Sequence, residues 1–319
     1  DDRGRLPVPA PATGLGTGVT AAAAPASSGT EDDAGRAGTL YVVATPIGNL
    51  GDVTLRAIEI LRSVPLIAAE DTRHTHRLLA RHGIATRTTS YHARSGPGRA
   101  TALLDHLRSG EDLAIVTDAG TPGVSDPGGE LVSAWVAAGG TVVPIPGASA
   151  VLAAVVGSGV AGPRWSFEGF LPRGGRERRE RLARVAADDR ATVLYEAPGR
   201  VGATLADLAA ACGHERPGAV CRELTKLHET IERGTLGELA AAAGDGRIPA
   251  RGEFTLVVGE WAGARPAAAP EAAADALRDA RAEVERLVAG GLGRSEAARR
   301  VAAATGLSRR QLYGATASG

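Results

Sequence analysis

The stretch from residue 116 to residue 129 constrains the fold of this chain more than any other segment. It reads Val-Thr-Asp-Ala-Gly-Thr-Pro-Gly-Val-Ser-Asp-Pro-Gly-Gly, between an apolar run at 113–116 and a helix-like segment at 130–138. Loops between a strand and a helix usually have 2–6 residues, and open α/β sheets place ligands at the carboxyl ends of their strands. The pattern therefore predicts a ligand-binding loop in an α/β sheet. The alternative is a tight strand–helix connection that binds nothing.

Residues 39–150 alternate between short apolar runs and segments with helical spacing, as in a parallel sheet flanked by helices. Expected strands are 39–45, 64–69, 86–91 (at an edge), 113–116 and 141–145, and expected helices are 54–62, 74–82, 99–109 and 130–138. This segment is predicted to be an N-terminal α/β domain that carries the cofactor loops.

Residues 151–261 are predicted to form a second α/β domain with a mixed sheet. Expected strands are 192–196, 219–223 and 252–259, and expected helices are 151–161, 176–187, 201–211 and 235–243. The flanking segments are predicted to be a disordered extension (1–38), a linker rich in Ala and Pro (262–270) and a helical appendage (271–319) that resembles a helix-turn-helix. The fold class is thus α/β, with two domains, a cofactor cleft between them and a small helical appendage.

Composition excludes several classes of protein. Apolar residues make up 44% of the chain and the formal net charge is zero, which indicates a globular protein without a generally polyanion-binding surface. No apolar run reaches the roughly 18 residues of a membrane span. The two cysteines lack the spacing of a metal site, and His74 and His76 point to different sides of a helix, so we expect no metal. The cysteines also imply no disulfide framework, which fits a cytoplasmic location.

Three glycine-containing loops follow three of the expected strands, at 45–52, 118–128 and 144–150. In this order they resemble the tetrapyrrole methylase superfamily, and within it the bacterial 16S rRNA (cytidine-2'-O)-methyltransferase branch. Further matching stretches are 70–73, 169–172, 195–198, 222–229 and 252–258. One departure is Gly199, where the branch usually has a histidine.

The resemblance implies S-adenosyl-L-methionine as the methyl donor, bound in the cleft between the two domains. It implies that the acceptor is a cytidine ribose 2'-hydroxyl in the decoding region of 16S rRNA, in the small ribosomal subunit. It also implies a homodimer, without a metal or a membrane.

Backbone groups of the glycine loops suit the polar groups of such a donor. Asp118 and Asp126 are candidates for its ribose hydroxyls or ammonium, although each alternatively bonds only its own backbone. The predicted cofactor-binding residues are Pro46, Gly48, Asn49, Asp118, Ala119, Gly120, Thr121, Pro122, Gly123, Asp126, Pro146, Gly147, Ser149 and Ala150.

A hydroxyl acceptor is a poor nucleophile at neutral pH, so a general base within hydrogen-bond reach is expected. The candidates are Glu70, Asp71, Glu196, Glu223 and Lys226, and the sequence does not choose among them. Lys226 is the only lysine of the chain. It is a candidate base or a cation that holds the developing oxyanion, and the alternative is a solvated surface ammonium.

Basic side chains are candidates for RNA contact: Arg73, Arg173, Arg176 and Arg200. Residues 173–184 read either as an edge that follows RNA phosphates or as a solvated helix with internal ion pairs. The C-terminal helices are expected to contact rRNA or the dimer partner.

Two other functions remain open at this level. One is a tetrapyrrole-type small-molecule methylase on the same fold. The other is a helix-turn-helix DNA-binding regulator with a ligand-sensing body. The arginine-rich segments and the branch motifs favour the rRNA enzyme over the first, and the intact glycine loops favour an enzyme over the second.

Overall fold

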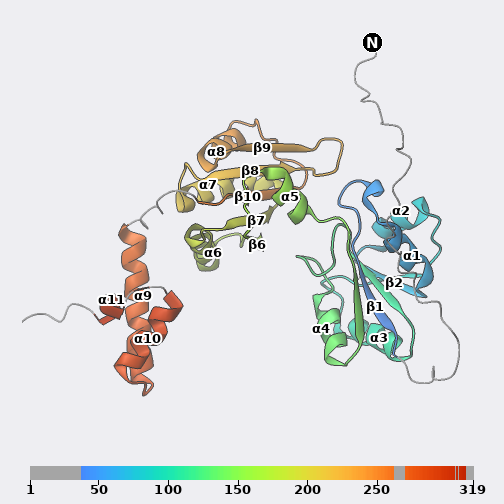
Figure 1. Ribbon diagram of the computed structural model, residues 1–319, viewed down its shortest axis with the longest axis horizontal. Coiled ribbons are helices and arrows are strands. Elements are labelled where there is room, and N and C mark those ends of the chain that lie inside the picture. The colour runs from blue at the N-terminus through green and yellow to red at the C-terminus, as the bar shows by residue number, and fades with distance from the viewer. Residues whose placement is uncertain (1–36, 262–269, 306, 308, 314–319) are drawn as a thin grey trace, which may run out of the picture. The chain divides into compact units, whose positions relative to one another are not determined.

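The computed structural model describes residues 37–261, 270–305, 307 and 309–313 (Figure 1). The predicted extension up to residue 36 and the predicted linker up to residue 269 lie outside the described residues. So does Gly306, the expected turn between the last two helices.

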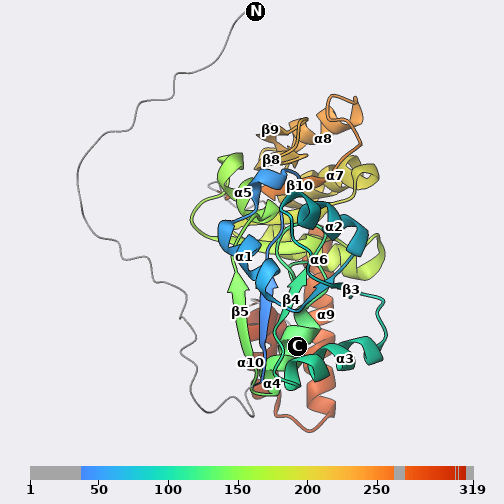
Figure 2. The same cartoon turned by 90° about the vertical axis from the view of Figure 1, so that its right-hand side faces the viewer.

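The first lobe is built on a parallel sheet of five strands in the order β3-β2-β4-β1-β5, of which Figure 2 labels β3, β4 and β5. Its strands are β1 Thr39–Val43, β2 Leu66–Ala69, β3 Thr88–Ser90, β4 Leu113–Val116 and β5 Thr141–Ile145. Its helices are α1 Leu55–Ser63, α2 Thr72–Arg81, α3 Pro97–Arg108 and α4 Gly129–Ala137. This confirms the predicted parallel sheet, with β3 at an edge.

Helices cover both faces of this sheet because successive strand residues point to opposite sides. On one face, Leu61 of α1 and Leu79 of α2 pack against Ile67. On the other face, Leu107 of α3 and Trp135 of α4 belong to the second apolar cluster of this lobe. Both clusters are buried, so the carboxyl ends of the strands are left as the surface that the loops can shape.

The second lobe contains a mixed five-stranded sheet in the order β6-β7-β10-β8-β9. Strands β6 and β7 are parallel and the other neighbours are antiparallel, which confirms the predicted mixed sheet. The strands are β6 Trp165–Phe170, β7 Ala191–Glu196, β8 Pro217–Arg222, β9 Thr230–Thr235 and β10 Phe254–Val258. The helices are α5 Ala150–Ser158, α6 Gly175–Ala187, α7 Val201–Cys212 and α8 Leu236–Gly244.

The two faces of the second sheet have different roles. Helices α6, α7 and α8 pack on one face and form an apolar core with it. On the other face, Ala154 of α5 packs with Cys221 and Val257, and Ile47 and Ala119 from the first lobe join the same cluster. This cluster therefore connects the lobes beside the glycine loops.

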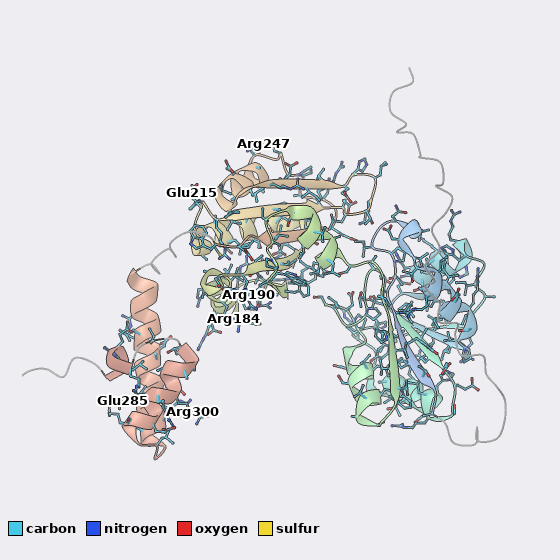
Figure 3. The ribbon with its side chains drawn as sticks, viewed as in Figure 1. Arg184, Arg190, Glu215, Arg247, Glu285 and Arg300 are labelled. Atoms are coloured by element: carbon cyan, nitrogen blue, oxygen red, sulfur yellow. The ribbon has the colours of Figure 1, made fainter. Side chains whose placement is uncertain are left out.

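Three helices follow in the C-terminal part: α9 Pro270–Ala289, α10 Arg294–Thr305 and α11 Arg309–Tyr313. They share an apolar cluster that includes Val284, Val301 and Leu312. Figure 3 labels Glu285 on α9, which forms an ion pair of 2.7 Å with Arg294. The predicted helical appendage is confirmed, while the predicted domain boundaries stay predictions. Within the described part of the chain, no helix has the length and apolarity needed to cross a membrane.

Candidate functional site between the two lobes

The three predicted loops meet because β4, β1 and β5 are neighbours in the first sheet. Thr45 and Gly120 exchange two backbone hydrogen bonds: Thr45 N donates to Gly120 O (2.9 Å) and Gly120 N donates to Thr45 O (3.1 Å). Gly120 has a φ of 80°, a conformation that favours glycine. A Cβ atom at Gly147 would lie 3.0 Å from the Cβ of Ala44. The loops are thus fixed to one another by close backbone approach.

The loop after β1 also lies against the second lobe. A Cβ atom at Gly48 would lie 2.3 Å from Cγ of Lys226 and 2.9 Å from Oγ1 of Thr225. A side chain at position 48 would therefore displace the side chain of Lys226 or Thr225. Thr225 and Glu223 both have positive φ angles, of 67° and 53°, so the facing loop adopts a conformation that non-glycine residues rarely take.

Two cavities open where the lobes meet. The first cavity has a volume of about 400 Å³ and the second about 530 Å³. The first is lined by Ile47, Ala119, Gly120, Thr121, Val124, Ser125, Asp126, Ser149, Ala150, Phe170, Tyr195, Glu196, Ala197, Pro198, Cys221, Leu224, Gly252, Glu253, Phe254 and Thr255. The second is lined by Thr45, Pro46, Ile47, Gly48, Leu50, His74, Thr75, Arg77, Leu78, Thr117, Asp118, Ala119, Lys226 and Glu253.

The first cavity is mainly apolar, and the carboxylates among its lining residues are Asp126, Glu196 and Glu253. The described residues that line it include no Lys, Arg or His. Burial, followed by the charges of Glu70 and Asp118, raises the pKa of Asp126 to about 6. Among the described residues, Asp126 forms no ion pair. A cationic ligand beside Asp126 would offset the free-energy cost of ionising this buried carboxyl.

Glu70 and Asp118 are linked to each other behind the loops. Asp118 N donates to Glu70 Oε2 (3.3 Å), and Asp118 Oδ1 accepts from Asp71 N (3.1 Å). Burial is the largest cause that raises the pKa of Glu70, and the backbone N–H of Asp118 opposes it. The hydrogen bond to Arg73 holds the pKa of Asp71 well below its usual range. Asp71 is therefore a weak base in this arrangement.

Lys226 is held at the second cavity by two carboxylates. Its Nζ lies 2.9 Å from Glu223 Oε1 and 3.0 Å from Glu253 Oε2, and its side chain is 25% exposed. Burial alone would lower the pKa of Lys226, but the hydrogen bonds to Glu223 and Glu253 outweigh it and raise the pKa. Lys226 is consequently a cation at neutral pH.

Glu196, another predicted catalytic residue, is buried and bonded to its own lobe. Its carboxylate accepts from Thr204 Oγ1 (2.6 Å) and from Ala197 N (2.8 Å), and Arg200 Nε lies 3.3 Å away. These bonds fix the end of β7, where the first cavity begins. The structure thus brings Glu223 and Lys226 into contact and gives Glu196 a structural set of partners.

The predicted cofactor residues fall into three groups. The first cavity is lined by Ala119, Gly120, Thr121, Asp126, Ser149 and Ala150. The second is lined by Pro46, Gly48, Asp118 and also Ala119. Neither is lined by Asn49, Pro122, Gly123, Pro146 or Gly147. Asn49 instead caps the short turn Leu50–Asp52 by accepting from Gly51 N.

The predicted RNA-contact arginines have different environments. Arg73 is 90% exposed and paired with Asp71, whereas Arg176 is paired with Glu180 at 2.6 Å. Arg173 is exposed. Arg200 donates to the carbonyl oxygens of Leu171 and Pro172 and thereby supports the end of β6.

Several lining residues were not singled out from the sequence, and Tyr195 is the clearest. Its ring contacts Phe167 (5.0 Å between centroids) and Phe170 (5.6 Å), and burial raises its pKa to about 12. The sequence did contain a signal for Tyr195, because this residue directly precedes the candidate base Glu196 at the end of an expected strand. Gly199, the departure from the branch pattern, has no heavy atom within 4 Å of the position that a Cβ atom would occupy, so there is room for a side chain there.

Among the described residues, no group of three or more His, Cys, Asp or Glu side chains is arranged to hold a metal ion. The parallel sheet with its glycine loops, joined to a mixed sheet, defines an α/β protein with a ligand site between two lobes. The fold is similar to that of uroporphyrin-III C-methyltransferase from Thermus thermophilus complexed with S-adenyl homocysteine. The TM-score is 0.52 at 21% identity, over 70% of this chain and 98% of that chain. At this identity the likeness shows the fold alone.

Sequence comparisons identify the family. The family model of tetrapyrrole (corrin/porphyrin) methylases matches residues 39–240. A ribosomal RNA small subunit methyltransferase I from Synechocystis sp. is 51% identical over 86% of this chain and 96% of its own length. One from Xylella fastidiosa is 44% identical over 87% of this chain and 98% of its own length. The chain belongs to the tetrapyrrole methylase family and is a methyltransferase, which confirms the resemblance and leaves the DNA-binding regulator unsupported.

Proposed function

We propose that this protein uses S-adenosyl-L-methionine to methylate the 2'-hydroxyl of a cytidine ribose in the decoding region of 16S rRNA. The observation that carries the proposal is the 51% identity, over 86% of the chain, to a protein named ribosomal RNA small subunit methyltransferase I. Relatives with this name match at 41–51% identity, whereas the similar uroporphyrin-III enzyme is 21% identical. The rRNA substrate is therefore favoured over a tetrapyrrole.

The first cavity fits the donor by size and by charge. Its volume of about 400 Å³ lies within the range of roughly 300–1,000 Å³ typical of small-molecule sites. Gly120 and Ala150 of the glycine loops are among the residues that line it. The donor is cationic and carries no phosphate, which suits the carboxylate of Asp126 and the absence of basic side chains among the described residues that line the cavity.

When bound, the donor supplies an electrophilic methyl group on a positively charged sulfur. The ribose oxygen would form the new bond to the methyl carbon, the carbon–sulfur bond would break with its electron pair left on sulfur, and the hydroxyl proton would pass to water. The chain contributes mainly position, because an in-line displacement depends on the alignment of the reacting atoms. The protonated Lys226 is proposed to stabilise negative charge at the acceptor oxygen rather than to act as the base.

The surroundings of the site support the rest of the proposal. Arg173 and Arg176 follow Phe170, which lines the first cavity, along the chain, and we propose that they contact RNA phosphates. We also propose that the protein acts in the cytoplasm, where its substrate is assembled. Its domains are proposed to be 39–150 and 151–261, followed by an appendage at 271–319. We further propose that the protein is a homodimer. Light scattering of the purified chain measures the oligomeric state directly.

The deciding experiment is transfer of labelled methyl from S-adenosyl-L-methionine to small subunits from a strain that lacks this modification. After nuclease digestion, the label is expected in 2'-O-methylcytidine from 16S rRNA. Uroporphyrinogen III serves as the competing acceptor in a parallel reaction. Unlabelled rRNA in the presence of protein that binds the donor would overturn the proposal, and label in the tetrapyrrole would replace it.

A further inference from the structure

The second cavity has a different chemical character from the first, although the two adjoin. Ile47, Ala119 and Glu253 line both. Yet the basic side chains at the site, His74, Arg77 and Lys226, all line the second. A ligand in the second cavity that reacts with a molecule in the first would therefore have to be compatible with positive charge around it.

Arg77 is the basic residue most available to a ligand. It lies on α2 one turn after His74, so both side chains belong to the same face of the helix. Arg77 is exposed and, within the described part of the chain, forms no ion pair. Arg73 of the same helix, by contrast, is bound through two nitrogens to Asp71. A free guanidinium at the rim of a cavity is suited to bidentate contact with a phosphate.

Two buried hydroxyls lie at the wall of the second cavity. Thr75 and Thr117 both line the second cavity and are 4% and 2% exposed. The Oγ1 atom of each has no hydrogen-bond partner among the described residues. Buried hydroxyls are nearly always bonded in proteins, so these two add unsatisfied polar character to the wall, although the protein encloses both oxygen atoms.

We infer that the second cavity receives the acceptor nucleotide of the rRNA, with Arg77 on a phosphate next to that nucleotide and Lys226 at the ribose side. The inference rests on the proposed function and assigns its acceptor site. A phosphodiester is the anionic part of the substrate, which suits the positive charges of Arg77 and Lys226. The shared residues Ile47 and Ala119 place the acceptor next to the first cavity, where the donor binds.

The test compares Arg77→Ala with Arg81→Ala, the same change at an exposed arginine of α2 that lines neither cavity. The full-length variants are assayed with small subunits at several salt concentrations, and donor affinity is measured by calorimetry. Arg77→Ala is expected to raise KM for the subunit about tenfold and to reduce the salt slope by about one phosphate contact. Donor affinity and the behaviour of Arg81→Ala should match those of the parent.

Charge reversal at the same position strengthens the test. Arg77→Glu is expected to raise KM further than Arg77→Ala, with unchanged donor affinity as evidence that the variant is folded. If the parent protein methylates subunits while both Arg77 variants match Arg81→Ala, the acceptor site is elsewhere and the inference fails. If the parent protein does not methylate subunits at all, the proposed function itself fails, so the two failures are distinguishable.

Discussion

The two cavities share three residues and differ in nearly everything else that bears on ligand choice. The first is walled by loop backbone and apolar side chains, with Asp126 as a carboxylate without an ion pair among the described residues. The second collects His74, Arg77 and Lys226. Under the proposed assignments, the difference teaches how one site separates two substrates of opposite charge: the first cavity favours a cationic donor and the second an anionic acceptor.

The largest effect is expected when the cation at the junction is removed. Lys226→Met should lower kcat about a hundredfold, because removal of one preorganised donor at a developing oxyanion typically costs 10²–10³. Donor affinity should stay unchanged, since Lys226 does not line the first cavity. Lys226→Arg, which keeps the charge, is the matched control and should retain part of the activity. An equal loss of donor affinity in the Met variant would show that the two cavities act as one.

Asp126 tests the charge of the first cavity through pH. In the parent protein, donor affinity should increase as pH rises through about 6, where the Asp126 carboxyl with its raised pKa ionises. Asp126→Asn should bind the donor about tenfold more weakly at pH 8 and should show no such pH dependence. Calorimetry at pH 5 and pH 8 measures both. The control is Asp105→Asn, an exposed aspartate on α3 whose partner is Arg108.

The same variant has a predicted effect on stability, with a definite sign. Because the folded-state pKa of Asp126 lies above its ordinary value of 3.8, its favourable contribution is present below that value and is lost as pH rises through about 6. Without ligand, Asp126→Asn should therefore unfold at a higher temperature than the parent at pH 8 and at the same temperature near pH 4. A variant that is less stable at pH 8 would contradict the burial of a charged group at this position.

The smallest expected effect concerns the unpartnered hydroxyl at the second cavity. Thr117→Val should increase the free energy of unfolding of the ligand-free protein by about 1 kcal/mol, since an unpaired buried hydroxyl costs that much or more. Thr192→Val is the matched control, because Thr192 is buried and its hydroxyl lies 3.2 Å from Ser166 Oγ. That change should lower the free energy of unfolding by about 1 kcal/mol. Denaturant titration of the two variants with the parent measures the contrast, and equal signs would contradict it.

The sequence predicted the fold well where the signal was local. Continuous apolar strands separated by helical segments were enough to predict the parallel sheet, and the mixed second sheet was also expected. Neither edge strand of the second sheet, β6 or β9, was predicted. In β9, the exposed Glu232 and Arg233 give no apolar pattern. Its formation depends on pairing with β8, which is a tertiary effect and outweighs local preference.

For the site, the sequence predicted the loops but not their division into two cavities. That division depends on Lys226 and Glu253, which come from the second lobe and meet Gly48 only in the folded chain. The unpartnered state of Thr75 and Thr117 depends likewise on burial by distant elements. The identity of the base stays a prediction among Glu70, Glu223 and the other candidates, although Lys226 is better suited to act as a cation.

The paired backbone hydrogen bonds between Thr45 and Gly120 have a consequence for how ordered the donor site is before any donor binds. These two residues form a small antiparallel bridge at the ends of parallel strands, and both of its hydrogen bonds join protein backbone to protein backbone. Both amide protons should therefore exchange slowly with deuterated water even before any donor is added. A wall that is already ordered costs little conformational entropy on binding, so added donor should slow exchange mainly elsewhere in the site and hardly at these two positions.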